Sequence, residues 1–118
     1  MANPNLVNVT SITGESVQAA LTTTLTTEIL AAASDTLVKI NNIIIANIDG
    51  SSSVDVSLFI TKSGGSPIAI ASTISVPADA TLVVSNTPIY LMEGDILKGG
   101  ASAASDLDLF ISYEVIKD

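Results

Sequence analysis

The sequence predicts an all-β fold, namely an antiparallel β-sandwich or jelly-roll-like domain of about eight strands with little or no helix. Three observations lead to this prediction. Apolar and polar residues alternate with a period of two in several segments, as in half-buried antiparallel strands. Clusters of Gly, Pro, Asp and Ser interrupt these segments at short intervals. Ile, Val and Thr, which suit a pleated surface, are frequent, and the 118 residues are expected to form a single domain, 1–118.

Each expected strand rests on this alternation and on the turn residues that bound it. Residues 53–62 are a clear case, because apolar side chains occupy every second position from Val54 to Ile60. Thr13–Glu15 is expected to be a turn, and Gly64–Gly65 and Gly99–Gly100 are interpreted as hairpin glycines. The expected strands are residues 5–12, 16–25, 27–32, 36–48, 53–62, 67–75, 80–92 with a break near Pro88, 95–101 and 106–116.

Two segments leave alternatives open. Residues 28–33 contain the good helix formers Ala and Leu, but six residues make barely two turns, so a strand is favoured over a short helix. Residues 37–48 are apolar on both parities around Ile43, Ile44 and Ile45. They predict either a central strand covered on both faces or a strand whose outer face meets a neighbouring molecule.

Composition excludes many functions. The chain has no Cys and no His, and its four basic residues are all Lys, so we expect no thiol or histidine catalysis and no zinc site. We therefore expect no enzymatic activity, no catalytic residues and no cofactor. A net charge of -8 argues against binding to nucleic acid. The longest apolar stretch, residues 37–48, contains Lys39 and three Asn, and the chain begins without a basic region, so neither a membrane span nor a secretory signal is expected.

Carboxylates are the only candidates for metal binding. Glu93 and Asp95 flank a glycine in an expected turn, while Asp106 and Asp108 lie two residues apart in an expected strand. Calcium prefers such oxygen ligands, but neither pair shows the spacing of a calcium-binding loop. The four residues are weak calcium candidates, and the favoured interpretation is that they are solvated acids at strand ends.

The excess of apolar residues points to contacts between subunits. Hydrophobic residues make up 47% of the chain, and successive strand residues point to opposite faces, so some must point away from the core. We expect a homo-oligomer in which these outward residues pack together, with residues 1–12 forming an extended arm that reaches a neighbour. The interface candidates are Ile43, Ile44, Ile45, Phe59, Phe110 and Ile116.

Three stretches resemble small virion proteins of tailed double-stranded DNA bacteriophages. The first is Met-Ala-Asn-Pro-Asn-Leu-Val-Asn-Val-Thr-Ser-Ile-Thr-Gly-Glu, residues 1–15. The second, residues 54–67, is an alternating strand that ends in Ser-Gly-Gly-Ser-Pro. The third comprises residues 89–97, with a Glu-Gly-Asp turn, and residues 101–115, which end in a strand. Together these stretches cover a little under half of the chain.

The resemblance implies an all-β virion component present in many copies, assembled in the host cytoplasm. Capsid decoration (cement) proteins, which stabilise the head, are the favoured type, and the resemblance implies a trimer docked on a viral shell protein. A neck or tail component remains an alternative, as does a module of the virion that binds carbohydrate on the host surface. A cellular adhesion-type sandwich is a further alternative.

Overall fold

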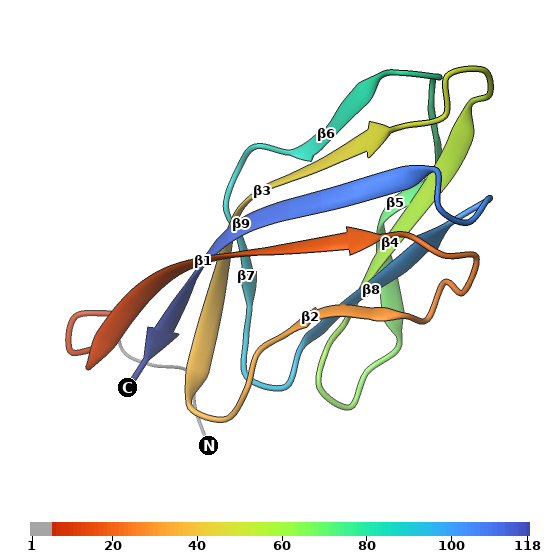
Figure 1. Cartoon of the computed structure of the whole chain (residues 1–118). Helices are drawn as coiled ribbons and strands as arrows, with labels where there is room; N and C mark the ends of the chain where they lie inside the picture. Colours follow the sequence, from red (N-terminus) through yellow and green to blue (C-terminus); the bar gives the residue numbers. More distant parts are fainter. Residues whose placement is uncertain (1–5) are drawn as a thin grey trace.

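A computed structural model describes residues 6–118 and contains nine strands and no helix within them (Figure 1). The all-β prediction is confirmed. The strands are β1 (Ser11–Ala20), β2 (Glu28–Ala31), β3 (Thr36–Asn47), β4 (Val54–Thr61), β5 (Pro67–Val76), β6 (Thr81–Ser85), β7 (Ile89–Leu91), β8 (Ile96–Ala101) and β9 (Leu107–Lys117).

The strands form two antiparallel sheets that face each other as a sandwich (Figure 1). The larger sheet has the order β1-β9-β3-β6, with β7 also paired to β3, and the smaller sheet has the order β2-β8-β4-β5. Because β6 and β7 pair with successive parts of β3, they act as one strand interrupted around Pro88, where a break was predicted. With these two strands counted as one, the order is that of an eight-stranded jelly roll.

The hydrophobic core lies between the sheets and is built from alternate residues of the long central strands. In β9, Leu107, Leu109 and Ile111 point inward and are at most 1% exposed. Ile40, Ile43 and Ile45 of β3 meet them from the neighbouring strand and are fully buried. The smaller sheet contributes Val54, Val56, Leu58 and Leu97 to the same core.

A β-bulge in β3 explains why residues 37–48 are apolar on both parities. The pairing register with β9 shifts between Ile40 and Asn42, so the chain accommodates one extra residue there. Ile40 and Ile43 therefore both face the core although they are three positions apart. Of the two interpretations given for this segment, a covered central strand holds for Ile43 and Ile45, whereas Ile44 points outward.

The predicted boundaries are wrong near the N-terminal end. A strand at 5–12 and a turn at Thr13–Glu15 were expected, but β1 begins at Ser11 and continues through Gly14 to Ala20. Gly14 fits within this edge strand because its Cα faces open space, with nothing within 4 Å of an added Cβ. Residue 5, the first of the expected strand, lies outside the described residues. Residues 28–33, the one possible helix, contain β2.

The interpretation of Gly99 and Gly100 as hairpin glycines is also wrong, because both lie inside β8. The loop after β1 runs along this strand: Ala101 N–H donates to Thr22 O (2.8 Å) and Gly99 N–H donates to Thr27 O (3.0 Å). A Cβ on Gly100 would lie 2.6 Å from Thr22 O, closer than real Cβ contacts. Glycine therefore permits the close approach of two backbone segments. Gly64, with φ +73°, does lie in a turn, as predicted.

Candidate functional site on the outer face of the larger sheet

Apolar side chains form a row across the outer face of the larger sheet. Strand pairing aligns Phe110 of β9 with Ile44 of β3, and Ile44 with Val83 of β6. Phe110 is 39% exposed and Val83 is 53% exposed, although both are large apolar residues. We call Ile44, Val83 and Phe110 the outer-face patch. Such a row on a sheet face is typical of a surface that contacts another macromolecule.

A shallow hollow adjoins the outer-face patch and extends it toward the edge of the sheet. Its volume is about 540 Å³. Its lining residues come from β1, β3, β6 and β9, and they are Gln18, Ala19, Ala20, Ile44, Ala46, Thr81, Asp108, Leu109 and Phe110. Small alanine side chains beside Phe110 leave this space open. Its lining carries one carboxylate, Asp108, and one hydroxyl, Thr81, and it includes no histidine, cysteine or lysine.

Of the six interface candidates, two lie on the outer face of the larger sheet, three are buried, and Phe59 lies on the other sheet. Ile44 and Phe110 lie side by side on the outer face. Ile43 and Ile45 are fully buried in the chain's own core and are not available to another subunit, which corrects their choice as candidates. Ile116 is only 4% exposed, so it too was a wrong choice, although it pairs with Ile12 and Leu37 outside the core cluster.

Phe59 lies on a different face from the outer-face patch. It belongs to β4 in the smaller sheet, where it pairs with Ala69 of β5 and Lys98 of β8. Its neighbours Leu58 and Ile60 pack in or against the core, so alternation places Phe59 on the outer side of that sheet, half-buried. Phe59 therefore cannot join Phe110 in one continuous surface.

The weak calcium candidates do not come together as a metal site. Among residues 6–118, no group of three or more His, Cys, Asp or Glu residues could hold a metal ion. Asp95 is 1% exposed and forms an ion pair with Lys62 Nζ. Glu93 instead accepts a hydrogen bond from the backbone N–H of Asp35. Asp108 is exposed on the outer face, two residues beyond the half-buried Asp106.

Asp95 has a structural role that the sequence did not reveal. Its carboxylate accepts hydrogen bonds from Met92 N–H (2.9 Å) and Ser63 N–H (3.2 Å) in addition to the Lys62 ammonium. Burial by itself raises the pKa of Asp95, but the hydrogen bonds from Lys62, Met92 and Ser63 outweigh it and hold the pKa below its usual value. Asp95 thus ties the β4–β5 turn to the turn before β8.

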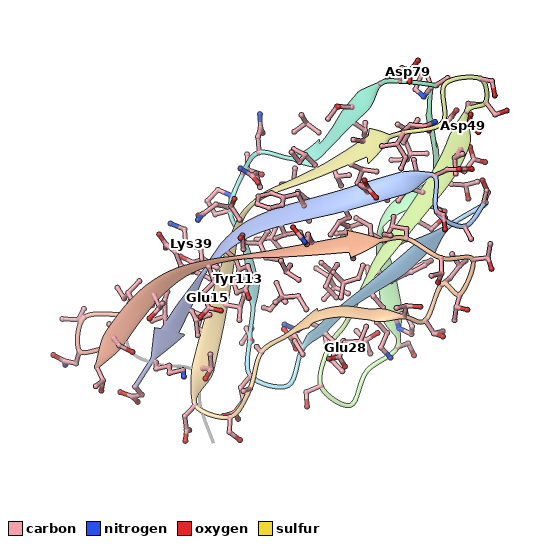
Figure 2. All side chains as sticks on the ribbon, viewed as in Figure 1. Glu15, Glu28, Lys39, Asp49, Asp79 and Tyr113 are labelled. Carbon is pink, nitrogen blue, oxygen red and sulfur yellow. The ribbon has the colours of Figure 1, made fainter. Side chains whose placement is uncertain are left out.

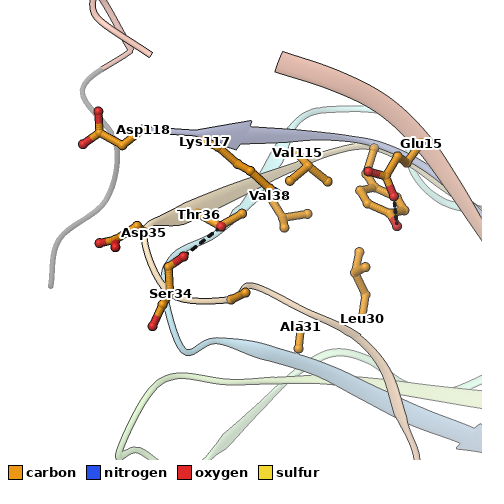
Figure 3. A pocket seen from close by; sticks show the side chains of 12 residues that line it. Glu15, Leu30, Ala31, Ser34, Asp35, Thr36, Val38, Val115, Lys117 and Asp118 are labelled. Atoms are coloured by element: carbon orange, nitrogen blue, oxygen red, sulfur yellow. Dashed lines mark hydrogen bonds between the residues drawn. The ribbon is translucent and has the colours of Figure 1, made fainter. Parts of the chain in front are cut away.

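A second cavity opens at the end of the sandwich, between β2 and the ends of β1, β3 and β9 (Figure 3). Its volume is about 510 Å³, and its walls include Leu30, Val38 and Val115. Tyr113 OH donates a hydrogen bond to Glu15 Oε1 (3.3 Å) at its side (Figures 2 and 3). Burial, followed by the charge and hydrogen bond of Glu15, raises the pKa of Tyr113. Only the strand register brings these two residues together, so the pair could not be predicted from the sequence.

Part of the expected N-terminal arm lies within the described residues. Leu6 and Val7 are 53% and 86% exposed, and Thr10 N–H donates to Lys117 O (2.8 Å). Residues 1–5 of the expected arm lie outside the described part of the chain. Within residues 6–118 there is also no helix long and apolar enough to cross a membrane.

No protein-family model matches the chain, and no curated protein matches it. Among solved structures, a protein of the Bacillus endospore appendages, a family of disulfide-linked pili, aligns with a TM-score of 0.53 and 14% identity over 91% of this chain and 87% of that one. The Drosophila NLP core, described with pentamer formation and histone binding, gives 0.47 and 12% over 92% and 97%. A pentameric capsid protein from metagenomic phage sequences gives 0.40 and 16% over 88% and 59%. The likeness to the Bacillus protein supports the β-sandwich fold, and the other two are too distant to carry an argument.

Proposed function

We propose that this protein is a non-enzymatic structural subunit of a multi-copy assembly, and specifically a bacteriophage virion protein of the capsid decoration type. The observation that carries the proposal is the outer-face patch. Phe110 and Val83 remain 39% and 53% exposed on a sheet whose inner face packs against the core. Full burial of an exposed side chain of this size contributes roughly 1.5–3 kcal/mol, and covering the exposed half of each against another subunit would contribute about half of that.

Chemistry and fold support the same proposal. The patch and the hollow beside it contain no histidine, cysteine or carboxylate cluster with which to catalyse a reaction. The Bacillus appendage protein comes from a family that forms pili, so the same kind of sandwich builds a repeating structure there. That family is disulfide-linked, whereas this chain has no Cys, so its contacts would be non-covalent. The virion assignment rests on the resemblance of residues 1–15, 54–67, 89–97 and 101–115.

The proposed partners are further copies of the chain and a viral shell protein. The resemblance to phage decoration proteins implies three copies per unit. A net charge of -8 suits exposure on a particle and disfavours contact with the packaged genome. We propose that the outer face, which bears the patch, is the side that meets the particle.

Immunogold labelling of purified virus particles tests the virion assignment. With an antibody against the purified protein, we expect gold on the heads. Gold confined to the neck or tail would contradict the decoration role and would support the second candidate, a neck or tail component. Particles without label, from a culture that makes the protein, would overturn the virion assignment.

Substitution within the patch tests the role of the outer face. Phe110→Ser should abolish rebinding of the protein to particles from which it has been removed, because it deletes the largest exposed apolar group of the patch. Ile68→Ser is the matched control, since Ile68 is 64% exposed on β5 of the other sheet. Equal rebinding by both variants would exclude the outer face as the contact. Binding to a glycan array that is lost in Phe110→Ser would favour a carbohydrate-binding module.

A further inference from the structure

The four sheet edges differ in how well they are protected against pairing with another chain. The β5 edge begins at Pro67, shifts register twice against β4, and contains Thr73 at φ 51°. The β6 and β7 edge is interrupted around Pro88, and β2 is only four residues long with a register shift. Bulges, prolines and short lengths are the features with which edge strands avoid pairing.

β1 has none of these protections. It is ten residues long, pairs with β9 without a register shift, and contains no Pro, no Lys and a single charged residue, Glu15. Figure 1 shows β1 at the border of the larger sheet, with β9 on one side only. Among the described strands, β1 is therefore the edge best suited to accept another strand.

The ladder with β9 shows which backbone groups of β1 are left open. Leu21 N–H donates to Leu107 O (2.9 Å), in continuation of the register that pairs Ala20 with Asp108. Hydrogen-bonded pairs alternate along an antiparallel ladder, so odd-numbered residues of β1 bond to β9. The N–H and C=O groups of the even-numbered residues point away from the sheet, and these residues are Ile12, Gly14, Ser16, Gln18 and Ala20.

We propose that two copies of the chain join by antiparallel pairing of β1 with β1 across a two-fold axis at Ser16. The pairing rests on the proposed role in a multi-copy assembly and names its contact. Only a register that places even-numbered residues opposite each other joins the open groups. Centring it at Ser16 uses all of them and makes roughly ten hydrogen bonds. It sets Gly14 opposite Gln18 and Ile12 opposite Ala20 of the second copy.

Side chains favour the same register. With the axis at Ser16, Glu15 faces Val17 of the second copy, whereas an axis at Glu15 would set two carboxylates directly opposite each other. Ile12 is 59% exposed in the described part of the chain. The pairing brings it against Ala20 of the second copy, at the border of the 540 Å³ hollow. An uncovered apolar side chain and an open apolar hollow thus meet, which is the reason to choose a second copy as the occupant.

The paired unit has a consequence for the outer-face patch. A two-fold axis perpendicular to the sheet keeps both outer faces on the same side, so the dimer presents two patches on one continuous sheet surface. This arrangement doubles the area available to a particle. It also replaces the trimer implied by the resemblance with a two-fold unit.

Proline substitutions at adjacent positions of β1 separate the outward edge from the chain's own ladder. Ser16→Pro removes an N–H that points away from the sheet, whereas Val17→Pro removes one that bonds to β9. We expect native mass spectrometry to give a dimer for the wild type and a monomer for Ser16→Pro, with the thermal unfolding of that monomer as cooperative as in the wild type. Val17→Pro should unfold at a clearly lower temperature.

Ser16→Lys provides a second test if the proline variant does not fold. Its backbone is unchanged, but two ammonium groups would face each other across the axis, so we again expect a monomer. A dimer that persists in Ser16→Lys, or a wild type that is monomeric, would overturn the β1 pairing. A trimer that resists Ser16→Lys and dissociates in Phe110→Ser would overturn the pairing and leave the proposed function intact. If the dimer depends on Ser16 but the antibody against the protein labels no particles, the β1 pairing would be supported and the proposed virion function would be overturned.

Discussion

At the scale of single residues, Asp95 shows how a buried charge becomes part of the framework. Three donors surround its carboxylate, two of them backbone N–H groups that would otherwise lack a partner in these turns. The Lys62 side chain is half-exposed, so solvent screens its charge and the backbone donors matter as much as the ion pair.

We predict that Asp95→Asn lowers the free energy of unfolding by about 1–2 kcal/mol at neutral pH, because an amide NH₂ would face donors instead of acceptors. The pKa of Asp95 is lower in the folded state than in the unfolded state. Its contribution is therefore complete above the unfolded value of about 3.9 and disappears as the pH falls through the lower folded value. Urea unfolding at a series of acidic pH values should show the two proteins converging. A constant difference down to the lowest pH would contradict this role of Asp95.

At Gly100, close packing against the backbone of the loop after β1 requires a glycine. Gly100→Ala should destabilise the fold by about 1–3 kcal/mol, because its Cβ would press against Thr22 O, 2.6 Å away. Gly14→Ala is the matched control, since an added methyl group there meets nothing and should leave stability unchanged or raise it by about 0.4–1 kcal/mol. Thermal unfolding of both variants measures the contrast. Equal melting temperatures would show that the loop after β1 moves away at little cost.

At the scale of elements, alternation along β3 decides which isoleucine side chains are buried in the core and which point outward. Ile45→Ala should destabilise the protein by about 2–5 kcal/mol, because it leaves a cavity in the fully buried core. Ile44 precedes Ile45 in β3 and points to the outer face of the sheet. Ile44→Ala should therefore lower the free energy of unfolding by only about 1 kcal/mol or less. Chemical denaturation gives both values. A larger loss for Ile44 would mean that the side assignments in β3 are reversed.

Much of the fold could be predicted because local alternation and turn residues suffice to place most strands. The strands from residue 36 onward start and end within a residue or two of their predicted limits, and the break near Pro88 was visible in the sequence. Gly14 misled the prediction because a glycine in an exposed edge strand looks the same as a glycine in a turn. Gly100 misled it because its close neighbour is the backbone of a loop far away in sequence.

The candidate site was predicted only in part, and for a related physical reason. Strand parity indicated an outer face for Phe110, but it did not separate Ile44 from the buried Ile43 and Ile45. Parity also does not say that Ile116 would be covered. The bulge in β3 shifts the parity within one strand, which a fixed period of two cannot represent. The Lys62–Asp95 and Glu15–Tyr113 pairs join residues far apart in the chain, so only the folded register reveals them.

At the scale of the whole molecule, the acidic residues within residues 6–118 lie apart and form no group of three or more that could hold a metal ion. We predict that the melting temperature is the same in calcium and in a chelator, because Asp95 is already saturated by donors and the other acids are separate. Differential scanning fluorimetry measures both. A rise of several degrees in calcium that disappears in Asp106→Ala would identify a calcium site after all.

We propose that this sandwich functions in multiple copies. Its packed core accounts for the inner faces of both sheets, while the outer-face patch and the open β1 edge have no partner within residues 6–118. Sedimentation equilibrium of the wild-type protein at micromolar concentration tests this most directly. We expect an average mass of at least two chains that increases with concentration. A mass of one chain at every concentration would contradict it.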